Sequence, residues 1–156
     1  MMENVNVRLS LCVAVMRGDL QTVKHIVVKE EWDINEIVSP AHKWTALAVT
    51  AKFGHCNIAE LLLDHGADVN AHSDNEGNTP LHLACAWGHC DVARLLLEKG
   101  TDVTNRNNDG CSPLDLVLDL PPDDPAREEF ISLFREYAPE MVMEAFCNAT
   151  PTGREP

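Results

Sequence analysis

The stretch TPLHLACAWGHC at residues 79–90 has an earlier counterpart, TALAVTAKFGHC, 34 positions before it at residues 45–56. The segment that follows each copy repeats at the same offset, as LLLDHGADVN at 61–70 and LLLEKGTDVT at 95–104. A third opening, SPLD, begins at Ser112, 33 positions after Thr79. A constant period of this length predicts a chain built from stacked supersecondary units.

Each unit carries the signals of two helices. Thr79 is a good N-cap and Pro80 suits the first helical position, where a missing N–H costs nothing. Gly88 ends the first helix as a left-handed cap, and Gly100 ends the second. The apolar residues expected on the inner faces of the two helices are Leu81, Ala84, Cys85, Val92, Leu95 and Leu96.

The weaker similarities at both ends complete four repeats, near residues 5–38, 39–73, 74–106 and 107–139. The first and last are degenerate, as expected of terminal units that cap a stack. A short helix is expected over residues 140–146, so that one domain spans 1–146. Residues 147–156 are expected to form a disordered tail.

The chain resembles the ankyrin-repeat family in its TPLH opening, its GADVN loop and its repeated Gly-His pair, over about 130 of its 156 residues. The resemblance implies an all-α solenoid of helix-turn-helix units with β-hairpin-like loops. It also implies a scaffold or regulator that binds a protein partner through its concave face. Inhibitors of cell-cycle kinases share the four-repeat size, so a regulatory inhibitor of an enzyme such as a kinase is the alternative.

The composition limits the classes of partner that the chain can bind. The net charge of −13 argues against nucleic acid and anionic membranes, which need a basic surface. It suits a basic protein, although acidity that only maintains solubility explains it as well. No apolar run is long enough to span a membrane. The six cysteines form no CxxC pair and favour a reducing compartment, the cytoplasm or the nucleus. We expect a monomer.

Zinc binding is an alternative for the two His-Cys pairs, His55-Cys56 and His89-Cys90. Equivalent residues of adjacent repeats lie about 8–10 Å apart, the packing distance of helices. Zinc needs its ligands within roughly 2.3 Å of one point, so no metal site is expected.

No motif of an enzyme is present either. His82 matches the family's histidine that bonds backbone groups and ties repeats together. The acidic residues between 115 and 124 lack a partner base, which is typical of a solvated surface. No Gly-rich phosphate loop follows a strand. We therefore expect neither catalysis nor a bound cofactor.

The second repeat departs from the family pattern. Ala46 and Ala48 replace the Pro and His of the opening, and Lys43 stands at the turn glycine. The loop at residues 37–44 is longer than usual, which predicts an irregular hairpin. Either a partner reshaped this loop or the sequence drifted neutrally.

Transferring the family's concave face onto this chain selects loop tips and the ends of the first helices. Phe53 is expected between Trp44 and Trp87, as the aromatic centre of an interface. The alternative is that these aromatics pack within the array. The candidate partner-binding residues are Trp44, Lys52, Phe53, Asn75, Glu76, Asn78, Trp87, Asn108, Asp109 and Asp119.

Asn70 is a second kind of candidate. Its GADVN context resembles the ankyrin asparagines that an asparaginyl hydroxylase modifies. The alternative is that Asn70 only stabilises its turn.

Overall fold

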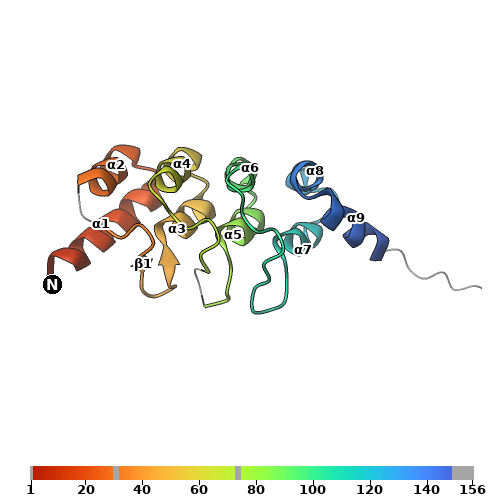
Figure 1. The fold of residues 1–156 in the computed structure, drawn as a ribbon, viewed down its shortest axis with the longest axis horizontal. Coiled ribbons are helices and arrows are strands. Elements are labelled where there is room, and N and C mark those ends of the chain that lie inside the picture. Colours follow the sequence, from red (N-terminus) through yellow and green to blue (C-terminus); the bar gives the residue numbers. More distant parts are fainter. Residues whose placement is uncertain (1, 30–31, 73–74, 149–156) are drawn as a thin grey trace, which may run out of the picture.

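The computed structural model describes residues 2–29, 32–72 and 75–148, with side chains from residue 6 onward, and places the helices in two layers (Figure 1). The first layer holds α1 (Met2–Arg17), α3 (Ala46–Phe53), α5 (Pro80–Ala86) and α7 (Pro113–Leu118). The second layer holds α2 (Leu20–Lys29), α4 (Cys56–Asp64), α6 (Cys90–Glu98) and α8 (Pro125–Tyr137), and α9 (Pro139–Asn148) closes the stack. The expected all-α solenoid is confirmed.

The core lies between successive helix pairs. Helix α3 packs between α1 and α5, and α5 packs between α3 and α7. A single pair cannot bury its own apolar face, so each pair depends on its neighbours. In α6, Val92 and Leu96 are buried as expected, whereas Leu95 is only half-buried and Ala93 and Leu97 complete the inner face. We propose that the four pairs form one domain.

Histidines at the start of the second helices tie each repeat to the one before it. The His89 Nε2–H donates to the Lys52 carbonyl at 2.8 Å, and His55 makes the same bond to the Met16 carbonyl at 3.2 Å. Gly54 is required here for two reasons. Its φ of 77° is left-handed, and a Cβ would lie 2.4 Å from Nδ1 of His89.

His82 connects the third and fourth repeats, as the sequence predicted. The Thr79 N–H and hydroxyl both donate to His82 Nδ1, at 3.2 and 2.8 Å. Nδ1 is therefore the unprotonated nitrogen, and Nε2–H donates to the Cys111 carbonyl at 2.9 Å. The ring is fully buried, so these bonds satisfy groups that water does not reach.

The loop of the second repeat forms a short irregular hairpin, as predicted. Strands β1 (Ile37–Ser39) and β2 (Trp44–Thr45) pair antiparallel with a register shift. Lys43 has a φ of 55°, the conformation that glycine would adopt more easily. Thr45 then caps α3 by accepting a bond from the Ala48 N–H at 3.3 Å. The hairpin thereby fixes the position of Trp44.

The C-terminal region differs in detail from the expectation. Helix α9 begins at Pro139 and continues through Asn148, so residues 147 and 148 are helical and not part of a tail. The remainder of the expected tail, residues 149–156, lies outside the described residues. Pro125 begins α8 at its first helical position, behind an Asp124 cap that accepts from the Ala126 N–H at 2.9 Å.

Candidate partner-binding site

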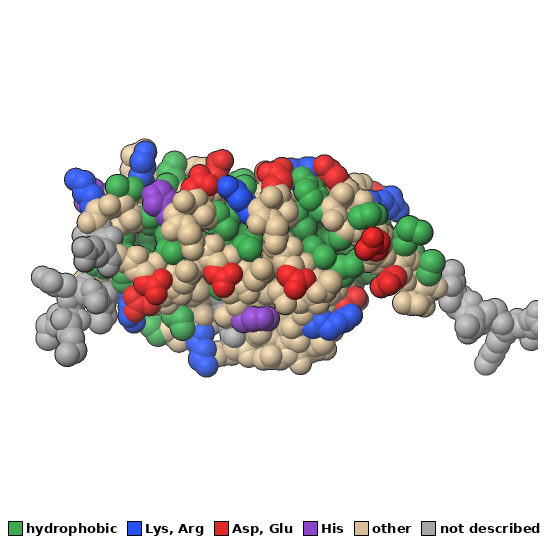
Figure 2. All heavy atoms as spheres, in the orientation of Figure 1, with side chains coloured by type: hydrophobic (Ala, Val, Ile, Leu, Met, Phe, Trp, Pro, Cys, Tyr) green, Lys and Arg blue, Asp and Glu red, His purple; other side chains and the backbone are tan. Residues whose placement is uncertain are grey.

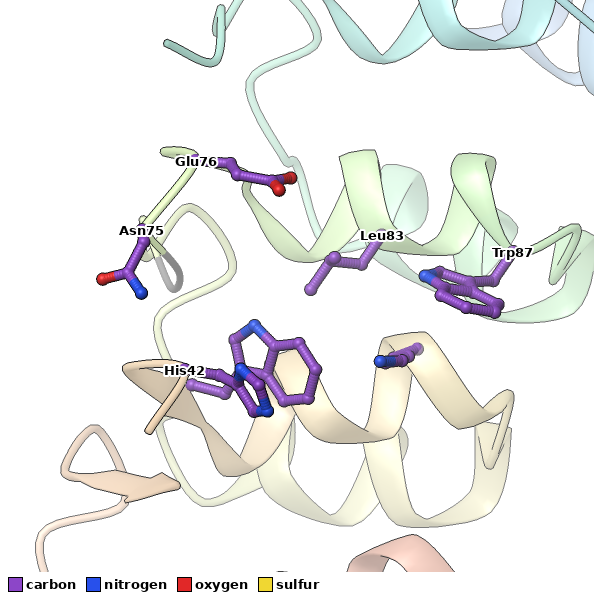
Figure 3. Close-up of a pocket in the computed structure, with 7 residues that line it drawn as sticks. His42, Asn75, Glu76, Leu83 and Trp87 are labelled. Carbon is purple, nitrogen blue, oxygen red and sulfur yellow. The ribbon is translucent and has the colours of Figure 1, made fainter. Parts of the chain in front are cut away.

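A hollow of about 220 Å³ opens between the second and third repeats, where the sequence placed the interface centre (Figure 3). Leu83 projects into it from α5, Trp87 projects into it from the position just after α5, and His42 approaches from the hairpin loop. The loop that precedes α5 contributes Asn75 and Glu76. The complete lining is His42, Trp44, Lys52, Asn75, Glu76, Leu83 and Trp87.

The Lys52 ammonium lies between the two indoles, which corrects the expectation for Phe53. Lys52 Nζ is 4.3 Å from the Trp44 ring centroid and 4.8 Å from the Trp87 centroid. Phe53 is the outer neighbour, with its ring centroid 5.9 Å from the same nitrogen. All three distances fall within the range of cation–π attraction. The aromatic centre is therefore built around a cation.

The two tryptophans differ in how they are held. Trp44 is half-buried and stacks on His42, with ring centroids 4.5 Å apart. Its indole N–H is buried and has no hydrogen-bond partner among the described residues. Trp87 is 56% exposed, so most of its surface is open to solvent. The half-buried Trp44 agrees in part with the alternative that the aromatics pack within the repeat array. The exposed Trp87 agrees with the expectation that they bind a partner.

Large apolar side chains are exposed at the ends of three successive first-layer helices. Met16 at the end of α1 is 45% exposed, Phe53 at the end of α3 is 37% exposed, and Trp87 follows α5. Met16 and the hollow's Leu83 and His42 are absent from the sequence-based set. Met16 stands at the end of a first helix and His42 at a loop tip, the two kinds of position that the family's concave face selects, whereas Leu83 carried no signal beyond a core position. We call Met16, Phe53 and Trp87, together with the hollow, the binding strip.

The loop tips are linked to each other rather than independent. The Asn108 side chain donates to the Asn75 carbonyl at 2.9 Å, and its backbone N–H donates to the Glu76 carbonyl at 2.8 Å. A Cβ at Gly77 would meet Asn108 Oδ1 at 2.6 Å, so glycine permits this approach. Asn108 and Asp109 are exposed at the adjacent tip but do not line the hollow.

Asn78 does not belong to the exposed surface, which corrects the sequence-based set. It is only 7% exposed. Its Oδ1 accepts from the Asn107 side chain at 3.0 Å, and its Nδ2 donates to the Glu76 carboxylate at 3.1 Å. The side chain joins two neighbouring loops and is not available to a partner.

The acidic residues near α7 serve mainly as caps and surface. Asp119 is exposed at the C-cap of α7, away from the hollow. Burial acts to raise the pKa of Asp115, but hydrogen bonds from the Ser112 backbone and hydroxyl, with Arg106 nearby, outweigh it and lower that pKa. Figure 2 shows further acidic side chains spread over the face of the molecule in view.

Asn70 makes the contacts expected of a turn-stabilising residue. Its Oδ1 accepts from the Thr101 hydroxyl at 3.0 Å and from the Asp102 N–H at 2.8 Å. Asn35 makes the equivalent bond one repeat earlier, accepting from the Asp68 N–H at 2.7 Å. These bonds give Asn70 a structural role, and its hydroxylation stays a prediction.

The two His-Cys pairs considered for zinc are engaged in contacts within the repeat array. His55 and His89 direct Nε2 to carbonyls of the preceding repeat. Burial, followed by the Glu129 carboxylate, raises the pKa of Cys90 to about 12, so its thiol stays protonated. Among the described residues, no group of three or more metal-ligating side chains converges. Within the same residues, no helix combines the length and apolarity needed to cross a membrane.

Comparison with known proteins identifies the family. A family model described as ankyrin repeats, in three copies, matches residues 11–107. The chain belongs to the ankyrin-repeat family. Ankyrin repeats generally mediate protein–protein interactions.

Individual relatives are varied. The chain is 36% identical over 104 residues to an ankyrin repeat protein of fowlpox virus, a match that covers 67% of this chain but only 30% of that protein. It is 32% identical over 121 residues to human protein phosphatase 1 regulatory subunit 27, covering 78% of this chain and 73% of the relative. It is 47% identical over 36 residues to the NF-kappa-B inhibitor cactus of Drosophila melanogaster, which is 23% of this chain and 7% of cactus. The chain thus spans less than a third of the fowlpox protein and of cactus.

Proposed function

We propose that this chain is a non-enzymatic regulator or scaffold that holds a protein partner against the binding strip. The observation that carries the proposal is the exposure of Trp87, at 56%, directly beside a hollow framed by a second tryptophan. Exposed aromatics next to a small pocket are what interface hot spots require, because a partner side chain can then exclude water from them.

The binding strip also has the dimensions of a protein contact. A hollow of about 220 Å³ is smaller than the roughly 300–1,000 Å³ typical of small-molecule sites. It accommodates one or two side chains, while Met16, Phe53 and the loop tips extend the contact on either side. The loop tips at Asn108 and Asp109 form the outer edge of this proposed contact.

Inhibition of an enzyme is the finer form of this proposal. Two of the similar proteins are named as a phosphatase regulatory subunit and as an inhibitor. These names support a regulatory role for the present chain. The cysteine pattern favours the reducing cytoplasm or nucleus, and the net charge of −13 favours a partner with a basic surface. We propose that the chain acts as a monomer. Hydroxylation of Asn70 is a separate proposal, tested by an intact-mass gain of one oxygen after co-expression with an asparaginyl hydroxylase.

The test is affinity capture with matched variants. Phe53→Ala removes an aromatic ring from the binding strip, and Phe146→Ala removes one from α9; the two side chains are 37% and 42% exposed. Because exposure is similar, both variants should lose a similar amount of stability. We expect Phe53→Ala and Trp87→Ala to lose the partner and Phe146→Ala to retain it. Equal recovery by all three variants would refute the binding strip.

A further inference from the structure

The free chain already holds a cation in its aromatic centre. The Lys52 ammonium lies 4.3 Å from the Trp44 ring centroid and 4.8 Å from that of Trp87. The two rings come from different repeats, Trp44 from β2 and Trp87 from the end of α5. The position between them is therefore a preformed cation site, since indole faces attract positive charge.

The other walls add negative charge and hydrogen-bonding capacity. Glu76 lines the same hollow from the loop preceding α5 (Figure 3). The net charge of −13 adds a long-range attraction for basic segments.

We propose that the hollow receives an arginine side chain of the protein partner, which displaces the Lys52 ammonium from between the tryptophans. This inference rests on the proposed function and specifies the partner's chemistry. A guanidinium is less strongly hydrated than an ammonium, stacks flat on an indole, and offers paired N–H groups to a carboxylate. An arginine can therefore stack on Trp87 and share the Glu76 carboxylate with the Asn78 side chain, whereas a partner lysine would only replace the Lys52 ammonium between the rings.

An acidic partner is the competing reading, with Lys52 as the recognising group. The aromatic faces on both sides and the Glu76 carboxylate in the same hollow oppose it, because both satisfy a cation and repel an incoming anion. The two readings predict opposite effects of removing the Lys52 charge. If Lys52 occupies the site, its removal strengthens binding, whereas if Lys52 is the recognising group, its removal abolishes binding.

The test is a titration of the full chain with capped pentapeptides, Gly-Gly-X-Gly-Gly, where X is arginine, lysine, trimethyllysine or glutamate. Two-dimensional NMR follows the indole N–H signals of the three tryptophans, with Trp32, which does not line the hollow, as an internal control. We expect the arginine peptide to shift the signals of Trp44 and Trp87 and to leave that of Trp32 in place.

Two variants complete the test. Lys52→Met keeps an unbranched side chain but removes the charge, and it should bind the arginine peptide about three- to ten-fold more tightly, because the site is no longer occupied in the free protein. Glu76→Gln should weaken that peptide about three-fold or more. Glu144→Gln, the same change at an exposed position on α9 outside the hollow and outside the binding strip, should leave it unchanged.

Three results would overturn the inference: no shift of the Trp44 and Trp87 signals in either wild type or Lys52→Met, weaker arginine binding by Lys52→Met, or a preference for the trimethyllysine or glutamate peptide. A folded spectrum for each variant makes these outcomes decisive. The proposed function fails separately, if Trp87→Ala still captures the partner. Trp87-dependent capture of a partner whose arginines are dispensable would reject the arginine site alone.

Discussion

Replacing His82 with alanine should weaken the junction between the third and fourth repeats. The buried imidazole accepts from the Thr79 N–H and donates to the Cys111 carbonyl. Alanine leaves both backbone groups without a partner in a region that water does not reach. Each unsatisfied buried group costs about 1–3 kcal/mol, so the free energy of unfolding should fall by about 3 kcal/mol or more.

Urea unfolding followed by circular dichroism measures this loss. With a slope of about 2 kcal/mol/M, the midpoint should move down by roughly 1.5 M. His25→Ala, the same change at an exposed position on α2, should cost no more than about 0.5 kcal/mol. Amide hydrogen exchange should accelerate more in α7 than in α1. The reason is that the lost bond to the Cys111 carbonyl holds the segment just before α7, whereas α1 lies at the other end of the stack. A cost below about 1 kcal/mol for His82→Ala, or one equal to that of His25→Ala, would refute the assigned role.

Two further changes probe the turns and the acidic caps. Gly54→Ala should lower the free energy of unfolding, measured in urea, by at least about 1 kcal/mol more than Gly100→Ala. Both glycines are left-handed, but only a Cβ added at Gly54 meets the His89 ring. Equal losses in the two variants would contradict the packing of His89 against Gly54. For Asp115, a folded-state pKa below the unfolded value of about 4 means that its stabilisation is present above pH 4 and is lost as the pH falls through the folded value. Asp115→Asn should therefore lose less stability than wild type between pH 6 and pH 3, and an unchanged pH profile would exclude this contribution.

The helices and turns followed from the sequence because their causes are local. A capping residue, a proline at the first helical position and a glycine at the end act within a few residues, and the repeat period showed which copies stack. The irregular hairpin was predictable for the same reason, since Lys43 stands where the pattern calls for glycine.

The site was predicted less completely because side-chain placement depends on the neighbouring repeat. Trp44, Lys52 and Trp87, which the alignment selected, line one hollow, but the direction of each side chain is set by packing. Lys52 folds back between the indoles, and Asn78 turns inward to bridge two loops. Neither orientation has a signature in the sequence.

The central claim, that the binding strip holds a protein partner, is tested most directly by the dissociation constant of a purified partner. Isothermal titration calorimetry should compare wild type, Trp87→Ala and Phe146→Ala at a temperature where all three are folded. Truncation of a hot-spot residue costs about 2 kcal/mol or more, so Trp87→Ala should weaken binding roughly 30-fold or more. Phe146→Ala should bind as wild type does. A Trp87→Ala constant within about two-fold of the wild-type value would contradict the claim.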